Sequence, residues 1–148
     1  MDKHLLAVLA TVFAGGLIAL QAPINSTLGR AIGSLPAATV SFAIGLAALV
    51  AITLLVGGGF GRLGEAGNLS WYYLTGGVLG AVYVTTALIA VRTLGAGGVT
   101  AATIAGQLTL SMVIDRLGIL GLEERELSFG RVVGIALLAA GTFLVVRE

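Results

Sequence analysis

Polar side chains that could bind a solute line one face of the apolar stretch from Val99 to Leu117. At about 100° per residue along a helix, they fall within an arc of roughly 120°. They are Thr100, Thr103, Gln107, Ser111 and Asp115, and they share the arc with Ile104 and Ile114. Thr109 falls on the opposite side, where its hydroxyl is expected to bond the carbonyl of Ala105. A polar side chain without a partner is costly in hydrocarbon, so the stripe is expected to face a cavity or another helix.

Two further amides, Gln21 and Asn25, lie four residues apart on one face of the first apolar run. Pro23 stands between them and has no N–H, so the carbonyl of Ala19 is free to bond water, a neighbouring helix or a solute. Amides donate and accept hydrogen bonds, which suits the recognition of a polar solute. The candidate solute-binding residues are Gln21, Asn25, Tyr83, Gln107 and Ser111. The alternative is that these side chains join helices to one another, and Ser111 can also bond back to its own helix.

Asp115 is a candidate either for coupling transport to protons or for a structural ion pair. It lies roughly 24 Å into its helix at about 1.5 Å per residue, and therefore only ~6 Å from the far interface of a hydrocarbon core of about 30 Å; Arg116 follows it directly. This position near the membrane interface favours the structural role.

The composition excludes most functions of soluble proteins. The chain has 148 residues, of which 57% are hydrophobic and 10% are charged, and its mean hydropathy is +1.07. A formal net charge of +1 indicates no general electrostatic attraction to nucleic acid or to anionic lipid. There is no cysteine and only one histidine, His4, so no disulfide, metal site or other cofactor is expected. An intramembrane enzyme is not expected either, because the sequence has no HExxH motif, no serine–histidine pair and no paired intramembrane carboxylates.

Five apolar segments are long enough to cross a membrane. We predict spans at residues 5–28, 37–56, 71–91, 99–117 and 129–146. About 20 residues of helix match a hydrocarbon core of about 30 Å. Because the loops are short, residues 1–148 are expected to form a single all-α transmembrane domain whose termini lie on opposite sides. The first run could also be read as a signal peptide, but it lacks a clear small-residue cleavage site and continues into QAPINSTLGR.

Small residues and the charge distribution indicate how these helices assemble. Gly76 and Gly80, and likewise Gly130 and Gly134, are small-xxx-small pairs that let helices approach closely in lipid. The side with the N-terminus would carry Lys3, Arg62, Arg116, Arg125 and Arg131, and the other side Arg30, Arg92 and Arg147. This bias is weak, and a chain with a weak bias can insert in both orientations and pair with an inverted copy of itself.

The segments QAPINSTLGR and AGQLTLSMVIDRLG resemble those of small single-repeat members of the drug/metabolite transporter superfamily, and in particular of the YdcZ-like family of bacterial inner-membrane exporters. The resemblance implies a half-repeat bundle of four core helices plus one in the inner membrane. It also implies a homodimer, or a heterodimer with a similar chain. Relatives that export cationic drugs carry a membrane-embedded carboxylate deep in the first helix. This chain has Gln21 and Asn25 there, which disfavours proton-coupled cation antiport through that site.

Together these features predict a membrane transporter. We expect a secondary carrier or exporter of a small polar or amphipathic solute, working by alternating access in a dimer within the lipid bilayer. The alternative is a non-transporting structural membrane subunit that scaffolds a partner protein. A channel is less favoured, because Ile104 and Ile114 interrupt the polar stripe.

Overall fold

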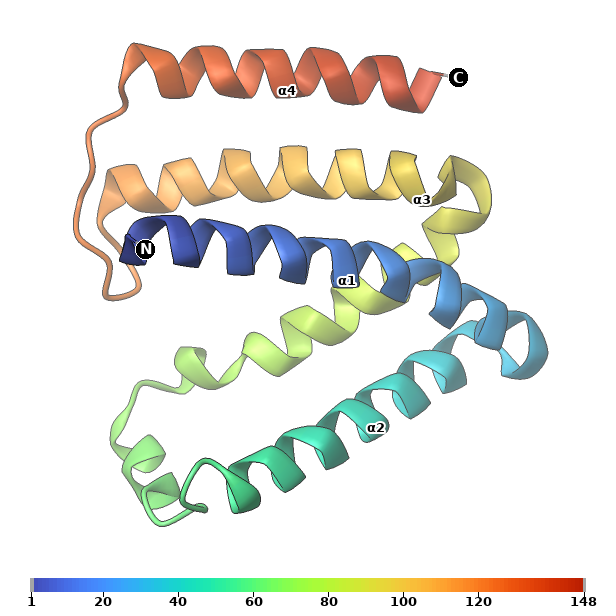
Figure 1. Ribbon diagram of the computed structural model, residues 1–148, viewed down its shortest axis with the longest axis vertical. Coiled ribbons are helices and arrows are strands. Elements are labelled where there is room, and N and C mark those ends of the chain that lie inside the picture. The colour runs from blue at the N-terminus through green and yellow to red at the C-terminus, as the bar shows by residue number, and fades with distance from the viewer. Residues whose placement is uncertain (1, 148) are drawn as a thin grey trace. The chain divides into compact units, whose positions relative to one another are not determined.

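The structure, a computed structural model, describes residues 2–147 and is built from helices (Figure 1). Its elements are α1 (Lys3–Ile32), α2 (Ser34–Leu55), η1 (Leu63–Asn68), η2 (Trp71–Leu74), α3 (Gly76–Leu117) and α4 (Phe129–Arg147). The elements η1 and η2 are short 3-10 helices in the connection between α2 and α3. No strand occurs among the described residues, which confirms the prediction of an all-α protein. Each of the four α-helices is long and apolar enough to cross a membrane.

Helix α3 contains a break at Gly95, which divides its 42 residues into two helical segments. Gly95 has φ 67° and ψ 172°, a backbone conformation that essentially only glycine adopts. The segments 76–94 and 96–117 are about 29 and 33 Å long at about 1.5 Å per residue, and each matches a hydrocarbon core of about 30 Å. They overlap the predicted spans 71–91 and 99–117, but residues 71–74 of the predicted third span form the short 3-10 helix η2 and lie outside α3. The connection expected at residues 92–98 is therefore helical except at one glycine.

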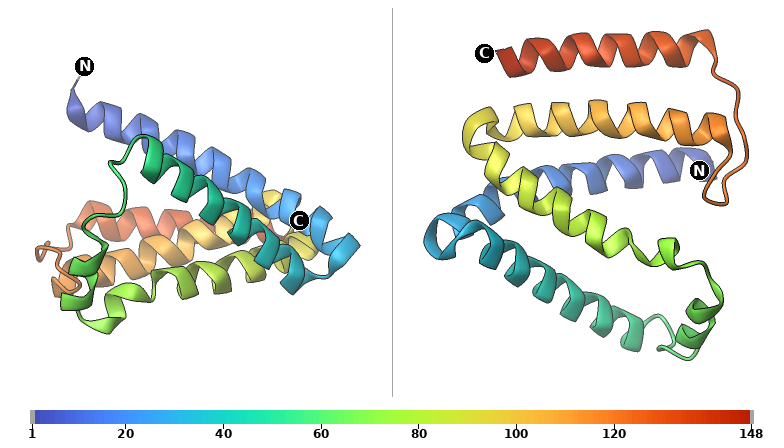
Figure 2. Two further views of the ribbon diagram at one scale, coloured as in Figure 1. Left: turned by 90° about the horizontal axis from the view of Figure 1, so that it is seen from below. Right: turned by 180° about the vertical axis from the view of Figure 1, so that it is seen from behind.

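Helices α1 and α2 form a hairpin with Gly33 as the single residue between them (Figures 1 and 2). Gly33 has φ 93°, which glycine adopts without steric cost. Its N–H donates to the carbonyl of Gly29 at 3.0 Å, and its carbonyl accepts from the N–H of Ala37 at 3.0 Å. Because the turn is bonded on both sides, both helices extend into residues 30–36, which the sequence predicted as the connection between the first two spans.

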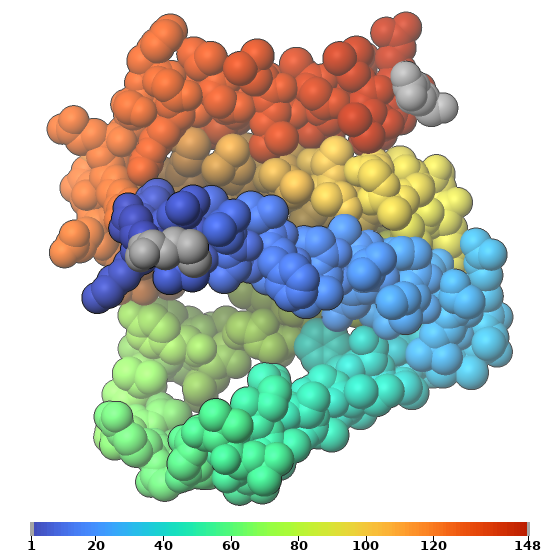
Figure 3. Space-filling view, in the orientation of Figure 1, coloured from blue at the N-terminus to red at the C-terminus, as the bar shows by residue number. Residues whose placement is uncertain are grey.

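The chain forms two compact units, which comprise the residues up to 92 and those from 93 onward. In the first unit, Ala38 of α2 packs with Val84 and Leu88 of α3 to form a small apolar core. This core lies near the joined end of the hairpin. Toward their other ends α1 and α2 separate, as the space-filling view shows (Figure 3).

In the second unit, the later segment of α3 and helix α4 run antiparallel and are connected by the loop 118–128 (Figure 2). The hydroxyl of Thr142 donates to the carbonyl of Ala101 at 3.1 Å, which links the two helices. The loop turns back tightly at Gly118, where a Cβ would lie 3.1 Å from the backbone nitrogen of Glu124. The loop therefore follows the end of α3 closely.

Large apolar side chains cover the outside of both units. Phe13, Leu55 and Phe129, for example, are 70%, 84% and 84% exposed. An apolar surface of this extent is unfavourable in water and suits contact with lipid chains. Polar side chains on these helices are therefore the exceptions, and they are the ones to examine for a functional site.

Candidate functional site

The buried residues of α1 lie on one stripe and include two polar side chains. They are Ala22, Asn25, Ser26 and Gly29, at the spacing of a single helical face. Asn25 is 5% exposed and Ser26 is 3% exposed. The Nδ2 atom of Asn25 is buried and has no hydrogen-bond partner among residues 2–147. A buried donor left unsatisfied in this way costs about 1–3 kcal/mol.

Gln21 lies one turn before Asn25 on the same face of α1, but its side chain is exposed. Pro23 lies inside α1 without ending the helix, and the hydroxyl of Thr27 donates to the carbonyl of Pro23 at 3.0 Å. The proline leaves the carbonyl of Ala19 without its usual helical donor. Of the two predicted amides of α1, only Asn25 thus lies in the packed part of the first unit.

Arg92 connects three helices at the joined end of the hairpin. Its Nε donates to the hydroxyl of Ser26 on α1, and its Nη2 donates to the hydroxyl of Ser34 on α2, both at 3.2 Å. The guanidinium lies so close to α1 that a Cβ on Gly29 would be 2.9 Å from Nη2. From the sequence, Arg92 entered only the comparison of positive charges on the two sides of the membrane. Its two hydroxyl partners are 66 and 58 residues away, and nothing in the residues around Arg92 indicates them.

Tyr83 on α3 is half-buried and packs against the apolar core of the first unit. It directly precedes Val84, which belongs to that core. The ring therefore has a packing role on one side, and its partial exposure leaves the other side open to a solute.

The polar stripe of the second unit is partly buried at its start and exposed in its middle. Thr100 and Thr103 are half-buried, whereas Gln107 and Ser111 are exposed. The hydroxyl of Thr109 donates to the carbonyl of Ala105 at 2.8 Å, which confirms the prediction made for that side of the helix. An exposed amide within a membrane span requires a partner other than lipid.

Asp115 lies half-buried at the end of α3 and faces α4. Its Oδ2 is 3.5 Å from Nη1 of Arg131, while the neighbouring Arg116 pairs with Glu124 of the loop. The N–H of Arg125 donates to the carbonyl of Asp115 at 2.8 Å. The carboxylate considered for coupling thus has a cationic partner on the next helix. Among the described residues, no group of three or more His, Cys, Asp and Glu side chains is arranged to hold a metal ion.

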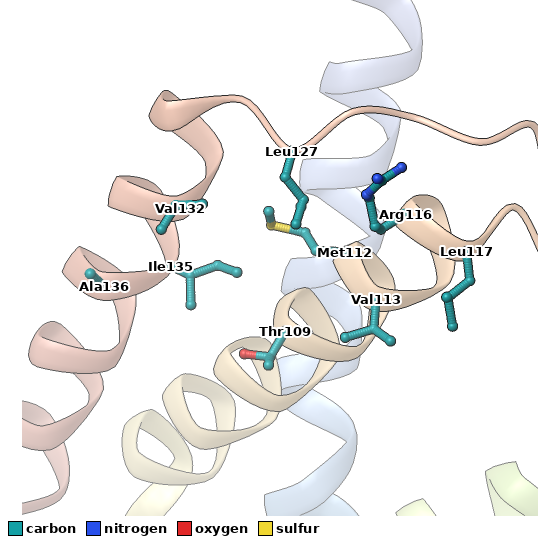
Figure 4. Close-up of a pocket in the computed structure, with 9 residues that line it drawn as sticks. All are labelled: Thr109, Met112, Val113, Arg116, Leu117, Leu127, Val132, Ile135 and Ala136. Atoms are coloured by element: carbon teal, nitrogen blue, oxygen red, sulfur yellow. The ribbon is translucent and has the colours of Figure 1, made fainter.

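Two cavities lie between α3 and α4 in the second unit. Figure 4 shows the first, of about 430 Å³, with the side chains of Met112, Leu127 and Ile135 directed into it. Its lining is Thr109, Met112, Val113, Arg116, Leu117, Leu127, Val132, Ile135 and Ala136. The second, of about 490 Å³, is lined by Ala102, Ala105, Ala139, Thr142, Phe143, Val146 and Arg147. Both linings are almost wholly apolar and, within the described part of the chain, include neither Gln107 nor Ser111, so they suit acyl chains better than a polar solute.

Of the glycines predicted to pack helices, Gly80 lies against another helix: a Cβ there would be 3.4 Å from Cζ of Phe42 on α2. In the described chain, no other helix lies within 4 Å of a Cβ placed on Gly76, Gly130 or Gly134. The surface of α4 around Gly130 and Gly134 is therefore open for close approach by another helix.

A comparison with known protein families matches nearly the whole chain. The family model described as "Putative inner membrane exporter, YdcZ" covers residues 6–144, and so extends across all four α-helices. No curated protein and no solved structure matches the chain. The similarity therefore concerns the helical bundle as a whole and is not limited to one motif.

Proposed function

The chain belongs to the YdcZ family of inner membrane exporters, and we propose that it is a secondary carrier that exports a small polar or amphipathic solute. It is a multi-pass inner-membrane protein. In this proposal the chain crosses the membrane five times, through α1, α2, the two segments of α3, and α4. Alternating access would move these helices around a central site that opens to one face of the membrane at a time.

The observation that best supports a solute site is the buried Nδ2 of Asn25, for which residues 2–147 supply no hydrogen-bond acceptor. Buried polar groups in a purely structural bundle are almost always hydrogen-bonded, because an unsatisfied donor is destabilising. A solute that accepts a hydrogen bond would satisfy this donor. Pro23 adds an acceptor on the same helix by freeing the carbonyl of Ala19. A donor and an acceptor on a largely apolar helix suit a solute with one polar group and an apolar body.

The exposed amides support a dimer. Gln21 and Gln107 are exposed, and because an amide that faces lipid is costly, we infer that a second copy or a similar chain covers them. An antiparallel homodimer is favoured, because helix rise would place Gln21 level with Asp115 of an inverted copy. Cysteine variants at these two positions should then cross-link between copies. Cross-linking confined to identical positions in parallel copies would contradict the antiparallel arrangement.

Ligand-dependent thermal unfolding of the purified chain tests the carrier proposal. We expect at least one compound in a library of small polar and amphipathic solutes to raise Tm. Asn25→Leu should abolish this rise, because it removes the amide at similar volume. Thr11→Val is the matched control, since Thr11 bonds only the carbonyl of Ala7 on its own helix, at 2.8 Å. Unchanged solute binding and transport in Asn25→Leu would remove Asn25 from the site.

A non-transporting subunit that scaffolds a partner protein would keep the polar stripe of α3 inaccessible to water, whereas a carrier would expose it. The chain has no cysteine, so Gln107→Cys and Ser111→Cys each provide a unique thiol. A carrier should expose both thiols to a water-soluble reagent in at least one of its open states. If both stay unreactive and no solute raises Tm, the chain is a scaffold.

A further inference from the structure

The cluster around Arg92 has features of a built site. Ser26, Ser34 and Arg92 come from three different helices and are joined by two hydrogen bonds of 3.2 Å. Gly29 allows this close approach, because a Cβ there would lie 2.9 Å from Nη2 of Arg92 and displace the guanidinium. A guanidinium has five N–H donors, and these two bonds use only two of them. Arg92 is exposed and Ser34 half-buried, so the remaining donors can be reached from outside.

Carboxylates of the first unit lie far from this cluster. The sequence up to residue 92 contains two, Asp2 and Glu65. Asp2 caps the opposite end of α1, roughly 36 Å from Ser26 along the helix. Glu65 lies in the connection between α2 and α3 and pairs with Arg62 at 2.8 Å. The joined end of the hairpin thus carries positive charge with no acidic side chain of its own unit beside it.

The start of α2 adds hydrogen-bond donors at the same place. Ser34 is the first residue of α2, and the N-cap, Gly33, offers no side-chain cap within the described chain. The N–H groups of Ser34 and Leu35 therefore lack intrahelical acceptors, and the positive end of the helix dipole lies there. Arginine, hydroxyl and main-chain N–H donors are thus present together at this end of the hairpin.

We propose that Arg92, Ser26 and Ser34 form a binding site for a phosphate-type oxyanion. The anion would accept from the guanidinium N–H groups that do not bond the two serines. Each serine hydroxyl accepts from Arg92 and so holds the guanidinium in place for the anion. The same chemistry is presented by the headgroup of an anionic lipid and by a free phosphate in water. This site is separate from the carrier proposal and does not depend on it.

Two arms of one binding experiment distinguish the sources of the anion. The full chain is titrated with inorganic phosphate in detergent at constant ionic strength, and is separately unfolded in phosphatidylcholine vesicles with and without phosphatidylglycerol. We expect Tm to rise by a few degrees in at least one arm. A rise with phosphate assigns a free anion, and a rise with phosphatidylglycerol alone assigns a lipid headgroup. No rise in either arm overturns the proposal.

Variants separate this site from general attraction by positive charge. Arg92→Gln should weaken binding about tenfold or more, since it removes a charged hydrogen-bond donor. Arg30→Gln is the matched control, because it removes the same charge from the same end of the hairpin and should bind nearly as the original chain does. An equal loss of anion binding in Arg92→Gln and Arg30→Gln overturns the proposal. If Arg92→Gln does not fold, the double variant Ser26→Ala/Ser34→Ala replaces it as the test. This variant keeps the charge of Arg92 but should bind the anion several-fold more weakly than the original chain. Unchanged anion binding in the double variant would refute the site.

Discussion

The Oδ2 atom of Asp115 lies 3.5 Å from Nη1 of Arg131, so that the end of α3 is joined electrostatically to the start of α4. This separation is long for a hydrogen bond, and Nη1 is buried without a hydrogen-bond acceptor among the described residues. The attraction is therefore coulombic and modest. The carbonyl of the same aspartate also accepts from the N–H of Arg125 at 2.8 Å. Asp115 thus holds both the loop and the following helix, which supports a structural role.

The first prediction concerns this ion pair. Asp115→Asn and Arg131→Gln should each lower the free energy of unfolding by up to about 1 kcal/mol, because both side chains are about one-third exposed and screened. The double variant should lose little more than either single one, since the two residues share one interaction. Denaturant titration followed by circular dichroism measures all three, with Glu123→Gln as the exposed control. Loss of transport in a stable Asp115→Asn protein would instead identify a coupling carboxylate.

The second prediction tests the contact between α2 and α3. Gly80→Leu should destabilise the chain by about 1–3 kcal/mol, because a side chain there must displace the ring of Phe42, already 3.4 Å from the Cβ position. Gly76→Leu is the matched control on the same helix, where no atom lies within 4 Å in the described chain. Equal stability of the two variants would show that α2 and α3 do not pack at this point.

The helices were largely predictable, and the connections between them were not. Long apolar runs indicate helices in lipid because hydrocarbon leaves the backbone few alternatives. At Gly33 and Gly95, however, the whole connection depends on one backbone conformation, and the residues around each glycine read equally well as loop or helix. The predicted connections at residues 30–36 and 92–98 were therefore too long. The hydrogen bond from Thr109 to Ala105 was predicted correctly because its geometry is local to one helix turn.

The candidate site was predictable only where it depends on a single helix. The pattern placed Gln21 and Asn25 on one face, but whether each is buried depends on where α1 and α2 separate, which periodicity does not encode. The bonds of Arg92 to Ser26 and Ser34 join distant parts of the chain, and a guanidinium can pair with many hydroxyls of similar spacing. The substrate roles of Gln21, Asn25, Tyr83, Gln107 and Ser111 stay predictions.

The third prediction concerns the ion pair in the loop between α2 and α3. Arg62 donates two hydrogen bonds to Glu65 and lowers the pKa of that carboxyl below its ordinary value. Because the folded pKa is depressed, the pair stabilises the loop above the ordinary glutamate pKa, and this contribution is lost as the pH falls through the folded pKa. Carboxyl NMR titration should show the pKa of Glu65 rising in Arg62→Gln and unchanged in Arg30→Gln, which removes a charge at the far end of the hairpin. An unchanged pKa in Arg62→Gln would contradict the pairing.

The last prediction concerns the break in α3. Gly95→Ala should destabilise the chain by about 1–3 kcal/mol, because φ 67° with ψ 172° places a Cβ in a conformation that is essentially restricted to glycine. Gly97→Ala lies two residues later within helix and has open space around its Cβ position in the described chain, so it should stabilise by about 0.5–1 kcal/mol. Equilibrium unfolding followed by circular dichroism measures this difference in sign. If both variants were stabilised, α3 would be one continuous helix of 42 residues, roughly 63 Å long, and too long for a bilayer core of about 30 Å. The opposite signs expected at these two glycines therefore decide whether the chain crosses the membrane twice between Gly76 and Leu117.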